Sequence, residues 1–155
     1  MIRRADERDI EGIHRLLRQV LDVHHTGRPD LFREKAEKYT DEELREILKD
    51  DARPIFVSVS DDGYVEGYAF CIHQQQVGDN ILTDIKTLYI DDLCVDEGIR
   101  GSGTGRKLYE YVLEYAKAAD CYNVTLNVWA LNEDALEFYK KMGLSFQKFG
   151  METLL

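Results

Sequence analysis

Apolar residues recur at helical spacing in two segments of the first 50 residues. Between Asp6, which can cap a helix, and about His24 they lie on one helical face. A second helix is predicted from Thr40 to about Lys49, because Thr40 and Glu43 have the spacing of a capping box. Residues 25–33 contain a glycine and a proline and predict a loop, and residues 2–5 predict a short strand. The positions on the first helical face are Ile10, Ile13, Leu17, Val20 and Leu21.

The pattern changes to strand-like apolar runs after residue 54. Such runs cover residues 55–59, 64–73, 87–95 and 124–129. The turn Asp61-Asp62-Gly63 joins the first two runs as a hairpin, and the polar residues 74–80 predict a loop.

Two more helices are predicted between and after the last strands. Residues 101–119 carry an apolar face, and Asn132 caps a short helix from Glu133 to Met142, which Gly143 ends. Residues 145–155 are expected to form one or two short strands. The element order β-α-α-β-β-β-α-β-α-β describes an antiparallel first half that leads into a β-α-β unit, so the expected class is mixed α/β.

Length and charge restrict the classes of protein. A chain of 155 residues without a linker or repeat indicates one domain, residues 1–155. No apolar run approaches the roughly 18 residues that span a membrane, and the N-terminus lacks the apolar core of a signal peptide, so a cytoplasmic location is expected. The net charge of −10 disfavours nucleic-acid binding and favours, weakly, a cationic acceptor.

Cysteine and histidine spacing argues against a metal site. The three cysteines, at positions 71, 94 and 121, form no CxxC pair, and Cys71 and Cys94 lie in apolar strand-like runs typical of core residues. His24 and His25 are adjacent on a helix end, do not face one another and have no evident third ligand. No metal is expected.

A glycine-rich segment follows the predicted strand 87–95. Glycines at positions 101, 103 and 105 let the backbone approach a ligand closely. The helix that starts here presents unpaired N–H groups and a partial positive charge, which suit a phosphate. Arg100, Arg106 and Lys107 add cationic side chains at the same point. The segment from Arg100 to Gly105 therefore predicts a pyrophosphate cradle, and the alternative is a flexible turn without a ligand.

Two common nucleotide fingerprints do not fit this loop. The Walker pattern fails because Leu108 follows Arg106-Lys107 where a Ser or Thr would bind Mg²⁺. The dinucleotide pattern fails because its third glycine comes one residue early and no acidic residue closes the next strand.

The sequence resembles the GNAT superfamily of N-acetyltransferases. Its motif (R/Q)-x-x-G-x-(G/A) is matched by Arg100, Gly103 and Gly105, although Thr104 stands where an aliphatic residue is usual. The second motif, an Asn followed by a short helix with a Tyr and a final Gly, is matched by Asn132, Tyr139 and Gly143. The resemblance covers essentially the whole chain. It implies a mostly antiparallel sheet, splayed after the fourth strand and flanked by about four helices.

The resemblance also implies acetyl-CoA as co-substrate. The pantetheine arm would lie in the splayed gap beside the fourth strand, and the loop N–H groups would hold the pyrophosphate. A backbone amide near Cys94 would act as oxyanion donor, and Asn132 would contact pantetheine as well as cap its helix. The implied cofactor-binding residues are Leu93, Cys94, Val95, Arg100, Gly101, Ser102, Gly103, Thr104, Gly105, Arg106 and Asn132.

Two catalytic roles follow from the resemblance. Tyr139 would be the general acid for the CoA thiolate, because a phenol of pKa about 10 is protonated at neutral pH; the alternative is a packing aromatic beside Phe138. Asp91 is the first choice for the base that deprotonates the amine, because alternation places it on the face of Leu93 and Val95. Asp92, His73 and Glu152 are the other candidates, and transfer through ordered water is also open.

The acceptor and the assembly remain open at this stage. Small amines, polyamines, amino acids, antibiotics and protein amines all fit, and a homodimer is possible. Arg28 is a candidate for binding an acceptor carboxylate or for an ion pair with Asp30. The competing functional hypothesis is a non-catalytic acyl-CoA sensor, which would not need Tyr139.

Overall fold

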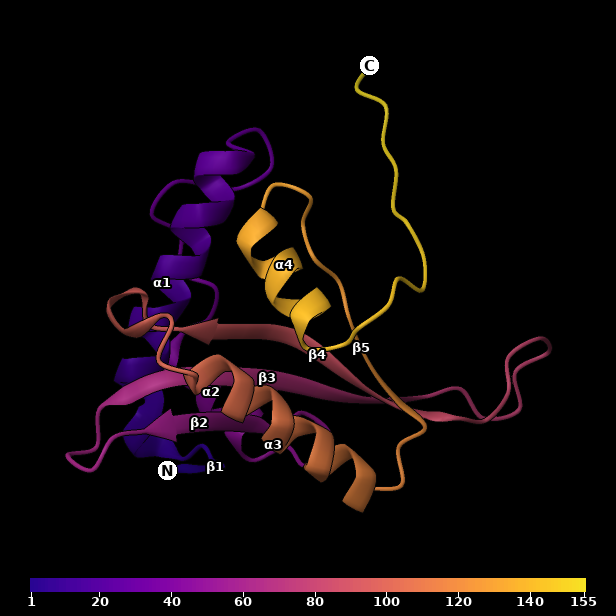
Figure 1. The fold of residues 1–155 in the computed structure, drawn as a ribbon, viewed down its shortest axis with the longest axis horizontal. Coiled ribbons are helices and arrows are strands. Elements are labelled where there is room, and N and C mark those ends of the chain that lie inside the picture. Colours follow the sequence, from indigo (N-terminus) through magenta and orange to yellow (C-terminus); the bar gives the residue numbers. More distant parts are fainter.

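A computed structural model describes residues 1–155 as a five-stranded sheet with helices on both faces (Figure 1). The sheet order is β1-β2-β3-β4-β5; its first four strands are antiparallel, and β5 is parallel to β4. This confirms the predicted mixed, mostly antiparallel sheet with four α-helices. The strands are β1 (Ile2–Arg4), β2 (Ile55–Val59), β3 (Val65–Gln75), β4 (Lys86–Val95) and β5 (Asn123–Leu126). The helices are α1 (Ile10–Gly27), α2 (Asp41–Leu48), α3 (Thr104–Ala118) and α4 (Glu133–Lys141).

Alternation along β2 and β3 divides the core into two clusters. Val57 and Tyr68 point to the face that α1 and α2 cover, whereas Phe56 and Ala69 point to the face that α3 covers. Figure 1 shows α1 and α3 on opposite sides of the sheet. No helix combines the length and the apolar character that crossing a membrane requires.

Polar caps set several helix starts. In α2, Glu43 N–H donates to Thr40 Oγ1 and Thr40 N–H donates to Glu43 Oε2, both at 3.1 Å, which is the predicted capping box. The sequence predicted that Asp6 caps the first helix. In the structure Asp6 instead caps a 3₁₀ turn (Glu7–Asp9) that precedes α1.

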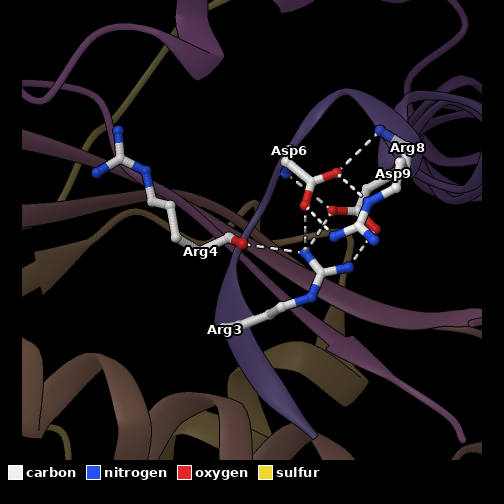
Figure 2. A network of polar contacts seen from close by, with 5 residues as sticks. All are labelled: Arg3, Arg4, Asp6, Arg8 and Asp9. Atoms are coloured by element: carbon white, nitrogen blue, oxygen red, sulfur yellow. Dashed lines mark hydrogen bonds and ion pairs between the residues drawn. The ribbon is translucent and has the colours of Figure 1, made fainter.

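Arg3 and Asp9 lock this N-terminal turn to β1 (Figure 2). The Arg3 guanidinium donates to both carboxylate oxygens of the buried Asp9, at 2.7 and 2.9 Å, and Asp6 N–H donates to the same carboxylate. A buried carboxylate with a bidentate partner is satisfied, so this network is structural.

A β-bulge in β4 breaks the alternation that was expected around Asp91. Phe70 of β3 pairs with Asp92, but the next residue, Cys71, pairs with Ile90, so Asp91 has no partner. As a result Ile90 packs into the α3-side cluster, whereas Cys94 packs into the α1-side cluster. The predicted placement of Asp91 on the face of Leu93 and Val95, opposite Asp92, was therefore wrong.

The sheet opens between β4 and β5. These strands pair only from Thr87 to Ile90, opposite Asn123 to Leu126, and residues 91–95 have no neighbour on that side. β5 is thus shorter than the predicted strand 124–129. The strands expected within residues 145–155 do not form.

Candidate functional site

A cleft of about 1060 Å³ lies where β4 and β5 separate. It is bounded by α1, the second half of β4, the loop before α3, the segment after β5, and α4. All of the predicted site residues line it, so one cavity unites positions from Asp91 to Tyr139. They are Asp91, Leu93, Cys94, Val95, Arg100, Gly101, Ser102, Gly103, Thr104, Gly105, Arg106, Asn132 and Tyr139.

The glycine loop offers unpaired backbone donors at one end of the cleft. Gly101 and Gly103 both have φ of 86°, and Gly103 is the N-cap of α3. A Cβ at either position would meet nothing within 4 Å, so it is the left-handed backbone that requires glycine. The N–H groups of Gly103, Gly105 and Arg106 donate to no protein atom. Free N–H groups at the start of a helix, together with its dipole, are suited to bind an anion.

Gly105 serves a different purpose from the other two glycines. A Cβ there would lie 3.3 Å from the Phe138 ring and 3.4 Å from Val95 Cγ2. The glycine therefore lets the first turn of α3 approach α4 and the end of β4 closely, which holds the loop at the mouth of the opened sheet.

Asp96 anchors the start of the glycine loop, a role that the sequence analysis did not predict. Its carboxylate accepts from Tyr64 Oη at 2.7 Å and Gly98 N–H at 2.9 Å, and it pairs with Arg15 of α1. Burial alone would raise the pKa of Asp96, but these donors lower it to about 2. The carboxylate is charged at neutral pH and fixes the start of the loop against α1. The sequence signal that could have indicated this role is an acidic residue directly after an apolar strand.

Cys94 contributes to the cleft without a reactive side chain. Its thiol is buried in the α1-side cluster, and burial raises the pKa of this thiol to about 12. The prediction that Cys94 is a core residue therefore agrees with its place in the fold.

Arg100 lies over the end of β4. Its Nε donates to the carbonyl oxygen of Val95 at 3.4 Å.

Tyr139 projects from α4 into the cleft with a free hydroxyl group. The residue is 9% exposed, and its hydroxyl makes no hydrogen bond within the protein. Burial, with the carboxylate of Asp92 and the thiol of Cys94 nearby, raises the pKa of Tyr139 well above its usual value. The phenol is protonated at neutral pH and can donate to a group in the cleft.

Two carboxylates lie opposite Tyr139 on β4. Asp91 Oδ2 pairs with Lys38 Nζ at 3.0 Å, and the two side chains are 31% and 32% exposed. Asp92 Oδ2 accepts from Tyr68 Oη at 2.6 Å. Burial raises the pKa of Asp92, while Tyr68 and Lys38 act in the other direction. Asp92 thus lines the cleft together with Asp91, and the charge of Lys38 acts on Asp92 as well.

The other predicted base candidates lie outside the cleft. His73 Nε2 is 2.9 Å from Tyr115 Oη, on the α3 side of the sheet. Glu152 pairs with Arg28, which also binds Asp30 at 2.8 Å. Arg28 therefore braces its own loop in this structure.

A group of aromatic rings that the sequence analysis missed lines the cleft. Ring centroids of His24 and Phe32 are 4.8 Å apart, and those of Phe32 and Trp129 are 5.2 Å apart. Burial, followed by the charge of Lys38, lowers the pKa of His24. His25 turns away and contacts the Phe32 carbonyl at 2.8 Å. No three His, Cys, Asp or Glu side chains converge as a metal site would require.

The cleft in the opened sheet brings free N–H groups at a helix start together with a phenol and two carboxylates, an arrangement suited to an extended ligand with a phosphate group. The acetyltransferase (GNAT) family model matches residues 17–144. The chain belongs to this family, and it is an acyl-CoA-dependent N-acetyltransferase.

Several known proteins are similar to this chain in sequence or in fold. A peptidyl-lysine N-acetyltransferase, YjaB, of Salmonella typhimurium is 29% identical over 142 residues, which are 92% of this chain and 81% of that protein. A mutant of the BH1408 protein from Bacillus halodurans is 32% identical, with a TM-score of 0.96 over 100% of this chain and 99% of that one. An aminoglycoside N-acetyltransferase, AAC(6')-Iy, in complex with CoA shares the fold at 16% identity, with a TM-score of 0.73 over 100% and 98% of the two chains.

Proposed function

We propose that the chain, as one domain of residues 1–155, transfers an acetyl group from acetyl-CoA directly to a primary amine. The observation that carries this proposal is the convergence of the glycine loop, the unpaired half of β4 and the Tyr139 hydroxyl in one cleft. A sensor that only binds acyl-CoA has no use for a free phenol at the far end of its ligand channel.

The residues present fit acetyl-CoA. The free N–H groups of Gly103, Gly105 and Arg106 would hold the pyrophosphate. Backbone groups of Leu93 and Val95 face the opened side of the sheet, because Asp96 N–H bonds to Glu66 of β3 and strand residues alternate; they would bind the pantetheine arm as a strand does, next to Cys94. Asn132 Oδ1 accepts from Ala135 N–H at 3.2 Å, which leaves its side-chain NH₂ free to contact the same arm. The bound co-substrate supplies a thioester carbonyl and a thiolate leaving group.

Tyr139 would give its proton to the departing thiolate. Its raised pKa keeps the phenol protonated, and Tyr139 of α4 lines the same cleft as Cys94, which supports this role. A backbone N–H near Cys94 would stabilise the negative charge that develops on the carbonyl oxygen.

Asp91 would receive the proton of the acceptor amine. In the structure the partner of Asp91 is the Lys38 ammonium, so an acceptor ammonium can take the same position by displacing Lys38. Asp92 is the competing candidate, since it lies in the same cleft with a raised pKa. The aromatic group of His24, Phe32 and Trp129 would pack against the carbon chain of the acceptor.

An assay of acetyl transfer to a panel of amines tests the function, and the release of free thiol is the readout. The panel includes polyamines, aminoglycosides and a lysine peptide, since the Salmonella relative is named a peptidyl-lysine N-acetyltransferase. At least one amine is expected to give saturable thiol release. Tight acetyl-CoA binding with no transfer to any amine would instead support the sensor.

A further inference from the structure

One lysine side chain of the protein occupies the place in the cleft that we propose for the acceptor amine. Lys38, in the loop between α1 and α2, lines the cleft, and its Nζ lies 3.0 Å from Asp91 Oδ2. Lys141 also lines the cleft, but it forms no ion pair with a carboxylate. Lys38 is therefore a primary amine of the chain itself that lies beside a candidate base.

The residues on either side of Lys38 hold its backbone in place. Glu37 Oε1 accepts from Arg18 of α1 at 3.0 Å. The Tyr39 ring stacks on Phe70 of β3, with ring centroids 5.8 Å apart. Because both neighbours are fixed to the body of the molecule, the loop delivers the Lys38 side chain to the cleft as part of the fold.

The charges around the Lys38 amine link it to the Tyr139 phenol. Burial lowers the pKa of Lys38, but interactions with Asp92, Tyr39 and Asp91 outweigh this effect and raise the pKa. The charge of Asp92 also contributes, after burial, to the raised pKa of Tyr139. One carboxylate thus acts on both the amine and the phenol, which requires both groups to lie near it in the cleft.

We propose that Lys38 is an acetylation site of the chain itself, and that it takes the acetyl group from the acetyl-CoA held in its own cleft. Self-acetylation rests on the proposed function, because the same thioester, carboxylate and phenol would serve an external amine. Lys38 needs no binding step, and a nucleophile held inside the cleft has the advantage of an intramolecular reaction.

Protons and bonds balance in this reaction. The Lys38 ammonium gives one proton to Asp91, and the neutral Nζ attacks the carbonyl carbon of the thioester. A C–N bond forms, and Tyr139 gives its proton to the thiolate as the C–S bond breaks. The nitrogen then loses its second proton, which restores the phenol, and the proton on Asp91 passes to solvent. The products are a neutral amide at Lys38 and free CoA thiol.

Acetylation would change the charge inside the cleft. An acetylated lysine carries no positive charge and forms no salt bridge, so Asp91 would lose its ion-pair partner. An acceptor ammonium would then meet a free carboxylate and would not have to displace Lys38.

Mass spectrometry of the full chain after incubation with acetyl-CoA alone tests the proposal. Peptide mapping should find acetylation of Lys38 at least about 100-fold faster than acetylation of Lys140. Lys140 is the internal control, because it pairs with Glu137 at the same 3.0 Å but does not line the cleft. The Lys140 side chain is 46% exposed and that of Lys38 32%, so a reaction in free solution would favour Lys140.

Two further measurements distinguish a reaction within the cleft from one in solution. The rate at Lys38 should saturate with acetyl-CoA concentration, whereas the rate at Lys140 should rise in proportion to it. The fraction of Lys38 modified at a given time should not depend on protein concentration, because each chain modifies itself. Lys38→Arg retains a cation that can pair with Asp91 but offers no amine, so this variant should lose the fast increase in mass.

Several results would overturn the proposal. They are equal rates at Lys38 and Lys140, a rate at Lys38 that does not saturate or that rises with protein concentration, and a fast mass increase that persists in Lys38→Arg. Thiol release with the amine panel shows whether the proposed function fails as well. An unmodified Lys38 in a chain that acetylates an external amine refutes self-acetylation alone, whereas an unmodified Lys38 in a chain that acetylates no amine refutes both.

Discussion

Burial determines the protonation of the side chains that face one another in the cleft. It raises the pKa of the Tyr139 phenol, which then remains a proton donor at neutral pH. It also raises the pKa of the Asp92 carboxyl, against the opposing effects of Tyr68 and Lys38. A donor and two carboxylates in one cavity are the components that amine acylation requires.

Removing the Tyr139 hydroxyl group should separate binding from transfer. Tyr139→Phe keeps the ring that packs beside Phe138, so acetyl-CoA affinity by calorimetry should be unchanged. Turnover by thiol release should fall by about 100-fold or more, the usual worth of a general acid. Tyr109→Phe is the control, because Tyr109 is equally buried but does not line the cleft. Equal turnover in all three proteins would remove Tyr139 from the mechanism.

The two carboxylates can be distinguished by the pH dependence of kcat/KM. A carboxyl group accepts a proton only in its ionised form, so with a carboxylate base activity should fall as pH drops through the pKa of that group. Asp91→Asn is expected to lower kcat/KM by about 100-fold and to abolish this fall, while Asp92→Asn retains it. Because burial raises the pKa of Asp92, an acidic limb shifted to higher pH that disappears only in Asp92→Asn would transfer the role to Asp92.

At the scale of elements, the sequence predicted which segments form helices and strands. It was less successful for the ends of the strands and for their pairing. Helix α2 and its capping box were predicted from Thr40 and Glu43, because a cap depends on residues three positions apart. The bulge at Asp91 was not predicted. It depends on the register between β3 and β4, and the sequence of one strand alone does not specify this register. The prediction of strands in residues 145–155 was wrong, because this segment extends away from the sheet and pairs with no strand.

Gly103→Glu should abolish acetyl-CoA binding through charge. The new carboxylate would stand at the start of α3, where the phosphates are expected, and opposed like charges cost several kcal/mol. The affinity for acetyl-CoA by calorimetry should fall by about 100-fold or more. Gly78→Glu is the control: Gly78 has φ of 67° and open space around it, so backbone strain is similar, but it lies in the loop before β4. Wild-type affinity in Gly103→Glu would mean that the cradle lies elsewhere.

On the scale of the whole molecule, Asp96 joins three parts that are distant in sequence. It binds Arg15 of α1, Tyr64 before β3 and Gly98 in the loop before α3. The end of β4 is thereby fixed to α1, and the phosphate loop starts from a rigid point.

Asp96 should make stability depend on pH in the acid range. Its pKa is lowered from 3.8 to about 2 in the folded chain, so its contribution is present above pH 3.8 and is lost as pH falls toward 2. Asp96→Asn should therefore lower the free energy of unfolding at pH 7 by about 1 to 2 kcal/mol and reduce the loss of stability below pH 4. Asp22→Asn, which removes an exposed carboxylate without a polar partner, should change neither. Denaturant unfolding at several pH values measures both, and an unchanged acid profile in Asp96→Asn would contradict the clamp.

The sequence by itself determined the local features of this protein: the glycine loop at a helix start, the Asn132–Tyr139 helix, the core cysteines and the family. These depend on residues close together in the chain, where spacing dictates backbone geometry. Only the tertiary structure decided that Asp91 pairs with Lys38 beside Asp92, that Asp96 holds the loop, that β5 pairs on one side only, and that residues 145–155 form no strand. Those features depend on strand register and on contacts between residues far apart in sequence, which no local pattern specifies.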